Sequence, residues 1–299
     1  MGTVVDKLNY LKDTKTAIKN ALVEKGVEVA DSDTFRSYAQ KVADIPAGGG
    51  DIDALIEGSL TEISSNVTRI RNNAFYFYNS LNKASFPKLE NISGGSFTGC
   101  NNLTSVSFPL VKTIESNAFQ NCSKLEIINI GLVESIGINA FKNCSSIKSL
   151  YLPKLINLIT TSSETGAFSY CKSLTEVNFP ILEKTSYDTF TYCTSLTKVL
   201  IPNLKKIYAN TFYGCSSITE LSFPLITEID VRAFYGCTSL TTLYIGTESE
   251  TVCTLLSTNA IPSNVTDIYV PEALVDSYKT ATNWSNFASK IKAYTGETA

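Results

Sequence analysis

Seven cysteines each follow a phenylalanine by three residues. The pairs are Phe97/Cys100, Phe119/Cys122, Phe141/Cys144, Phe168/Cys171, Phe190/Cys193, Phe212/Cys215 and Phe234/Cys237, and Cys253 is the eighth cysteine. Such thiols could form disulfides or bind zinc, but a zinc site needs paired C-x-x-C or Cys/His groups. The chain has no histidine. Because cysteine is small and commonly buried, we predict a ladder of free buried thiols, with no metal and no cofactor.

Two carboxylates offer another kind of chemistry. Glu176 and Glu220 occupy equivalent places two repeats apart, which is about 10 Å at the spacing of paired strands. That separation is near the one used by inverting glycosidases. The lack of histidine excludes a Ser-His-Asp or Cys-His nucleophile. Since the pattern implies no deep cleft, we predict that the protein is not an enzyme.

The Phe-x-x-Cys motif also sets a period. An eighth copy has Phe75 with Tyr78 in the cysteine place, and the steps between phenylalanines are 22, 22, 22, 27, 22, 22 and 22 residues. A period of 20 to 29 residues is typical of leucine-rich-repeat solenoids. We predict an α+β fold: a solenoid of about eight 22-residue rungs with one parallel sheet, a small helical N-terminal head and a C-terminal cap.

Each rung has a strand followed by a turn. In one rung, Val106-Ser107-Phe108 alternates as a strand does, and Pro109 ends it because proline cannot donate to a ladder. The long step of 27 residues places an insertion at 159–166. Insertions of this kind map to loops, which often carry function, although a tolerated surface bulge explains it equally.

The chain divides into five predicted segments. These are a helical head (1–45), a glycine-rich joint (46–50), an N-terminal cap (51–66), the repeats (67–246) and a C-terminal cap (247–299). The head carries an apolar heptad seam at Val4, Leu8, Leu11, Ile18 and Leu22. This seam predicts either a helical hairpin or an element for oligomerisation or docking. The oligomer expected from it is a homotrimer. In the C-terminal cap, 271–278 reads as a helix, and Trp284 as a core residue rather than a ligand anchor.

Side chains between the buried strand positions face outward and define a candidate binding surface. We select Tyr151, Glu176, Asn178, Lys198, Leu200, Glu220 and Tyr244. Aromatic rings with amides and carboxylates suit sugar or protein contacts, and an ordinary polar sheet face is the alternative. A second aromatic group, explained by a partner surface or by packing between rungs, comprises Tyr76, Phe77, Tyr78, Tyr170, Tyr192, Tyr213 and Tyr235.

Charge and hydropathy exclude several classes of protein. The net charge of −3 argues against a nucleic-acid binder, which carries a concentrated basic surface. The sequence has no run of 18 apolar residues, so we expect no transmembrane helix and no membrane insertion. The N-terminus lacks the apolar region of a signal peptide.

The A-F-x-x-C-x-x-L and L-x-x-V-x-F-P patterns over residues 67–246 resemble the BspA-like leucine-rich repeats. The segments 8–21, 26–29 and 34–39 resemble the head of tail-associated proteins of phages and prophages of gut bacteria. These resemblances imply a phage tail fibre or receptor-binding protein, located in the virion. Its sheet face would recognise a bacterial surface glycan or protein, and residues 1–45 would attach to a tail or baseplate protein. The alternative that they imply is a bacterial surface or secreted adhesin.

Overall fold

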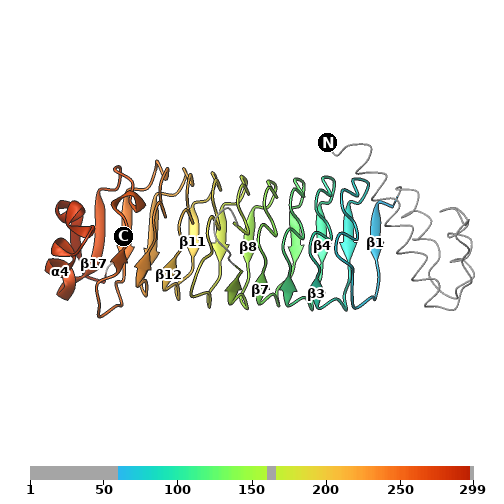
Figure 1. The fold of residues 1–299 in the computed structure, drawn as a ribbon, viewed down its shortest axis with the longest axis horizontal. Coiled ribbons are helices and arrows are strands. Elements are labelled where there is room, and N and C mark those ends of the chain that lie inside the picture. The colour runs from blue at the N-terminus through green and yellow to red at the C-terminus, as the bar shows by residue number, and fades with distance from the viewer. Residues whose placement is uncertain (1–59, 160–165, 297–299) are drawn as a thin grey trace, which may run out of the picture. The chain divides into compact units, whose positions relative to one another are not determined.

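The structure, a computed structural model, describes residues 60–159 and 166–296. The chain forms two compact units, Met1–Ile63 and Ser64–Ala299. The predicted helical head, its heptad seam, the joint and most of the N-terminal cap lie outside the described residues. The second unit is a parallel β-solenoid (Figure 1), which confirms the predicted fold class.

The first ladder of the solenoid contains one strand of three to five residues from each rung. Its parallel strands are grouped in the sheets β2-β4-β6, β8-β10-β11 and β13-β15-β17-β18, and β1 (Glu62–Ser64) precedes them in the chain. The bounds are β2 Lys83–Ser85, β4 Ser105–Ser107, β6 Ile127–Asn129, β8 Ser149–Tyr151, β10 Glu176–Asn178, β11 Lys198–Leu200, β13 Glu220–Phe223, β15 Thr242–Ile245, β17 Asp267–Pro271 and β18 Ile291–Tyr294.

A second ladder of two-residue strands lies on another side of each rung, where the sequence predicted no sheet. It comprises β3 Asn91–Ile92, β5 Thr113–Ile114, β7 Ser135–Ile136, β9 Asn157–Leu158, β12 Lys206–Ile207, β14 Glu228–Ile229 and β16 Thr254–Leu255. These strands pair in the orders β3-β5-β7-β9 and β12-β14-β16. A left-handed residue soon follows β3, β5, β7, β12 and β14 and keeps these strands short; Asn117, three residues after Ile114, has φ 60°.

The phenylalanines of the motif form a continuous stack inside the solenoid. Successive ring centroids from Phe75 to Phe234 lie 5.1 to 5.8 Å apart, and their planes differ by at most 17°. The stack continues across the long step, where Phe141 and Phe168 lie 5.6 Å apart. Burying each ring contributes roughly 1.5–3 kcal/mol, so this column is a principal part of the core.

The cysteine ladder is buried and unoxidised. All eight thiols are free and buried, which confirms the prediction from their spacing. From Cys100 to Cys237, each thiol donates to the carbonyl oxygen of the motif phenylalanine one rung earlier, with S···O distances of 2.9 to 3.2 Å. Burial raises the pKa of Cys171 and of Cys237 to about 12. These thiols therefore stay protonated at neutral pH, which is the opposite of what a nucleophile needs.

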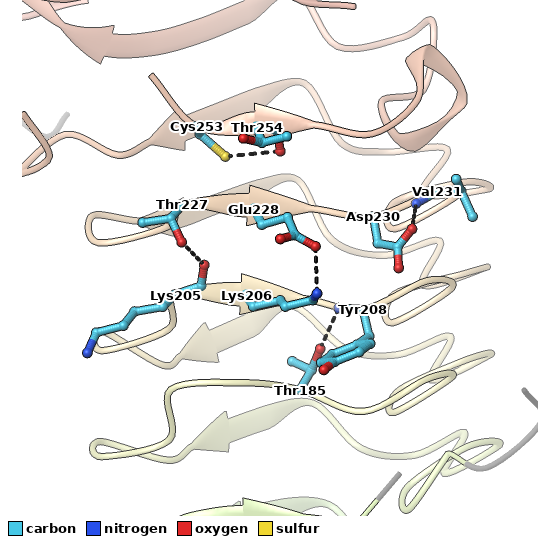
Figure 2. Close-up of polar contacts among 10 residues, drawn as sticks. All are labelled: Thr185, Lys205, Lys206, Tyr208, Thr227, Glu228, Asp230, Val231, Cys253 and Thr254. Carbon is cyan, nitrogen blue, oxygen red and sulfur yellow. Dashed lines mark hydrogen bonds and ion pairs between the residues drawn. The ribbon is translucent and has the colours of Figure 1, made fainter. Parts of the chain in front are cut away.

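The second ladder carries an interior hydroxyl and an ion pair, both drawn in Figure 2. Thr185 is buried, although the equivalent residues of other rungs are apolar, as at Ile114 and Ile207, and its Oγ1 accepts a bond from the Tyr208 N–H at 3.0 Å. The Lys206 ammonium lies 2.6 Å from Glu228 Oε1 and 4.6 Å from the centroid of the Tyr208 ring. Thr185, Lys206 and Glu228 thus each have a polar partner on this side.

The C-terminal segment adds helices to the end of the stack (Figure 1). These are η1 Thr258–Ala260, η2 Glu272–Leu274, α4 Val275–Thr280 and η3 Trp284–Lys290. The helix predicted near Pro271 is present as η2 and α4. Trp284 is buried, donates its indole N–H to the Cys253 carbonyl at 2.7 Å, and meets the Tyr278 ring edge-on. Its predicted role as a core residue is confirmed.

Candidate binding surfaces

The outer face of the first ladder aligns the side chains that the sequence selected. Asn178 is in register with Tyr151 on one side and Leu200 on the other. Glu176 is likewise paired with Lys198, and their charged groups lie 2.9 Å apart. The structure therefore brings five of the seven selected residues onto two adjacent columns of one sheet.

This face also exposes large apolar side chains. Tyr151 is 65% exposed and Ile127, in the preceding rung, is 66% exposed, while Leu200 is 37% exposed. Ile127 was not among the residues selected from the sequence. Because the equivalent places elsewhere are serines, at Ser105 and Ser107, the framework does not require an apolar side chain there.

Tyr244 does not lie on the open face. It is only 7% exposed, because its ring stacks on Tyr269 at 5.0 Å and meets the edge of Tyr294 at 5.8 Å. Burial, with a smaller effect of the Glu220 charge, raises the pKa of its hydroxyl. The added strands β17 and β18 bring these rings over it, which the repeat pattern alone did not indicate. Tyr244 is therefore removed from the candidate surface.

The two carboxylates have no catalytic setting. Glu176 is ion-paired with Lys198, and Glu220 is exposed at the start of β13. Neither lines any of the hollows near the tyrosines or the second ladder.

A row of four tyrosines follows the loop side, which is the side of each rung that carries Phe-x-x-Cys. We call Tyr170, Tyr192, Tyr213 and Tyr235 the tyrosine row. Successive ring centroids lie 5.1, 5.4 and 5.2 Å apart. The rings therefore pack between rungs, as one interpretation from sequence predicted. Tyr192 and Tyr235 remain 37% and 49% exposed, and a partner surface here stays a prediction.

The tyrosine row shifts by one repeat position between Tyr192 and Tyr213, next to Gly214. Tyr170 and Tyr192 occupy one position of the repeat, whereas Tyr213 and Tyr235 occupy the position before it. Gly214 is the residue equivalent to Tyr192, and a Cβ built on it would lie 2.7 Å from the Tyr192 ring. The ring of Tyr192 thus takes the space that a side chain at 214 would need.

A hollow of about 530 Å³ lies along this row. Besides three of the tyrosines it is lined by Lys142, Ser169, Asp188, Thr191, Asn210 and Arg232. The Thr191 hydroxyl bridges two of these, at 3.3 Å from Asp188 Oδ1 and 2.8 Å from the Asn210 carbonyl. Sequence reasoning missed Asp188, Asn210 and Arg232. Their position in the repeat holds asparagine or glycine in other rungs, as at Asn117, so the departures at 188 and 232 were a usable signal.

Three further predictions concern membrane insertion, metal binding and the insertion. Within 60–159 and 166–296, no helix is long and apolar enough to cross a membrane. The same residues contain no cluster of three acidic or thiol side chains placed to hold a metal ion. The insertion at 159–166 lies almost wholly outside the described part of the chain.

Comparison with known families now identifies the repeats. Residues 58–163 and 160–257 match the profile of the BspA type leucine rich repeat region, in six copies. The chain belongs to the BspA-type leucine-rich repeat family. This confirms the resemblance of the repeats. Because the match begins at residue 58, the likeness of residues 1–45 to phage tail proteins stays a prediction.

The chain is also similar to solved structures of leucine-rich repeat proteins. A leucine-rich repeat protein from Bacteroides ovatus is 24% identical with a TM-score of 0.54, over 78% of this chain and 65% of that one. A leucine-rich repeat protein from T. pallidum is 22% identical with a TM-score of 0.44, over 60% of this chain and 72% of that one. This chain thus spans less than two thirds of the B. ovatus protein. A search of curated proteins found no match.

Proposed function

We propose that this BspA-type repeat protein is a non-catalytic adhesin that binds a cell-surface macromolecule through the outer face of the first ladder. The observation that carries the proposal is the pair of large, two-thirds exposed apolar side chains on adjacent rungs, Ile127 and Tyr151. Exposed apolar side chains gathered on one face mark interaction sites more often than isolated ones do.

The surroundings of this pair support a binding face. The Glu176–Lys198 ion pair and Asn178 lie in the two rungs beyond Tyr151, on the same sheet. An apolar centre beside polar and charged groups is the usual organisation of a protein interface. The parallel sheet makes this surface rigid, so little conformational entropy is lost when a partner binds.

The phage tail fibre is the second candidate, and it depends on residues 1–45. Family membership favours the adhesin, since it concerns the repeats and not the head. Light scattering on the full-length protein tests the second candidate, because a tail fibre joined through the heptad seam is expected to be a trimer. A monomer would contradict self-association through that seam.

Cell binding tests the adhesin. Fluorescent full-length protein is incubated with bacterial and epithelial cells, and bound protein is measured by flow cytometry. Ile127→Ser with Tyr151→Ser adopts the residues found at equivalent places in other rungs, so the fold is kept. We expect binding to weaken at least about tenfold, as for a central interface residue. Leu256→Ser, at a 47% exposed apolar residue after β16, is the control and should bind normally. Unchanged binding by the double variant would contradict the proposal.

A further inference from the structure

We propose that the hollow beside the tyrosine row is a second binding site, and that it takes an extended glycan chain lying along the solenoid axis. The site is on the loop side and shares no residue with the outer face of the first ladder. It is therefore independent of the proposed adhesive face, and each can fail without the other.

Backbone conformation singles out this hollow. Among the described residues, five have positive φ without being glycine or asparagine: Phe77, Tyr170, Asp188, Tyr192 and Arg232. Four of these five line the hollow. A bulky residue in the left-handed region is strained by on the order of 1–3 kcal/mol, and such strain gathers at ligand sites. Other rungs avoid it with Asn121, Asn143 or Gly236 at the position of Tyr192. Asparagine or glycine at this position would therefore relieve the strain, but the rungs of Tyr170 and Tyr192 have tyrosine there.

The lining has the two kinds of group that a sugar ring needs. Partly exposed tyrosine rings provide flat faces for the C–H face of a pyranose, and a carboxylate, an amide and the cationic side chains of Lys142 and Arg232 provide hydrogen bonds to its hydroxyl groups. Asp188 and Asn210 occupy the rungs of the exposed Tyr192 and its neighbour Tyr213. Apolar faces and polar groups thus alternate along the same wall.

The length of the hollow favours a chain over a single sugar. Its lining runs from Lys142, in the rung of Phe141, to Arg232, in the rung of Phe234. Those rungs are four steps apart, or about 19 Å at the spacing of paired strands. The ring spacing of 5.1 to 5.4 Å follows from the same rung height, and it is comparable to the length of one sugar unit in an extended glycan.

An extended peptide fits this wall less well, because the backbone groups that it would pair with are already used. The N–H groups of Tyr170, Tyr192 and Gly214 donate to carbonyls of the following rung at 2.7 to 2.8 Å. Strand addition needs free backbone donors and acceptors at a sheet edge. What the wall offers instead is ring faces and polar side chains.

Affinity electrophoresis tests this assignment with the full-length protein. Native gels are cast with a neutral β-glucan, a xylan, a mannan or a polyuronate, and a glycan array extends the panel. We expect at least one of these glycans to retard the wild-type protein. Tyr192→Asn and Tyr213→Thr, both in the lining, use residues found at the same repeat positions in Asn143 and Thr191, which keeps the fold. Each variant should bind about threefold to tenfold more weakly, the loss of one stacking contact.

The controls check that the substitutions act at the hollow. Leu256→Ser, which lies outside both proposed sites, should leave glycan retardation unchanged, and circular dichroism checks that every variant is folded. The assignment is overturned if no glycan in the gels or on the array binds the wild-type protein. It is equally overturned if the doubly substituted Tyr192→Asn, Tyr213→Thr protein is folded and retarded like the wild type, because glycan binding would then occur elsewhere.

Discussion

The thiol of Cys122 donates a hydrogen bond to the carbonyl oxygen of Phe97, with the sulfur 3.0 Å from the oxygen. The same oxygen accepts the N–H of Cys100 at 3.1 Å, within its own rung. One carbonyl thus has both of its lone pairs engaged, once by its own turn and once by the next rung. The Phe-x-x-Cys motif therefore hydrogen-bonds adjacent rungs to each other as well as filling the core.

Removing this thiol should destabilise the solenoid. Cys122→Ala leaves a small cavity and an oxygen with only one partner, and we expect a loss of about 1–3 kcal/mol of unfolding free energy. Urea denaturation followed by circular dichroism measures it. Ser123→Ala, at the next residue, is the control and should stay within about 0.5 kcal/mol of the wild type. Equal stabilities of Cys122→Ala and the control would show that the thiol bond contributes nothing.

Alkaline pH should weaken the folded state through the same thiols. The pKa of Cys171 and of Cys237 is raised by burial from 9.0 to about 12, so both hold their protons in the folded protein while the unfolded chain loses them. Their contribution is complete below pH 9 and is lost as pH rises toward 12. Each thiol lowers the unfolding free energy by about 1 kcal/mol per pH unit in that window. Unfolding curves between pH 8 and 11 measure the slope, which Cys171→Ala should make shallower.

The same burial predicts slow thiol modification. At pH 8, a thiol reagent should label the eight cysteines of the native protein far more slowly than those of the urea-unfolded protein. Rapid labelling of native Cys171 or Cys237, detected by mass spectrometry, would contradict the buried ladder.

The rung period was readable from the sequence because buried positions recur with it. The phenylalanine stack, the free thiols and the outward columns around Asn178 all follow from counting residues. The second ladder was not readable, since two residues such as Thr113 and Ile114 show no alternation. The burial of Tyr244 depends on Tyr294, 50 residues later and outside the repeat. No local pattern could therefore have indicated it.

Gly214 and Tyr192 should be energetically coupled. Gly214→Ala places a Cβ 2.7 Å from the Tyr192 ring at a backbone with φ +69°. We expect it to cost about 2–4 kcal/mol in the wild type, of which about 1–2 kcal/mol is the left-handed conformation itself. In the Tyr192→Asn background only that second part should remain. A double-mutant cycle measured by urea unfolding gives the coupling, and additive costs would mean that the ring moves freely aside.

The Lys206–Glu228 pair should make a small, salt-dependent contribution. Glu228 raises the pKa of Lys206, and both side chains are about 30% exposed. Glu228→Gln should cost about 0.5–1 kcal/mol at low salt and less in 1 M salt, because exposed pairs are screened. Since the folded pKa of Lys206 is raised above 10.5, the contribution is complete below that pH and disappears as pH rises through the folded value.

A more exposed pair provides the comparison. Lys205 and Glu183 lie 2.6 Å apart with side chains about half exposed, so Glu183→Gln should have a smaller effect. Thermal melts at the two salt concentrations measure both variants. The same loss for both, unchanged by salt, would show that the carboxylates act through packing rather than charge.

The phenylalanine stack passes the 27-residue step without widening beyond its usual range, at 5.6 Å between Phe141 and Phe168. The number of residues between β9 and Phe168 therefore does not set the spacing between these two rungs. A foreign peptide could be grafted between Ile159 and Gly166 while the spine on either side keeps its spacing. For the same reason, related proteins can have a longer or shorter segment between β9 and Phe168. A single residue added between Phe141 and Cys144 would instead disturb the register between this rung and the next.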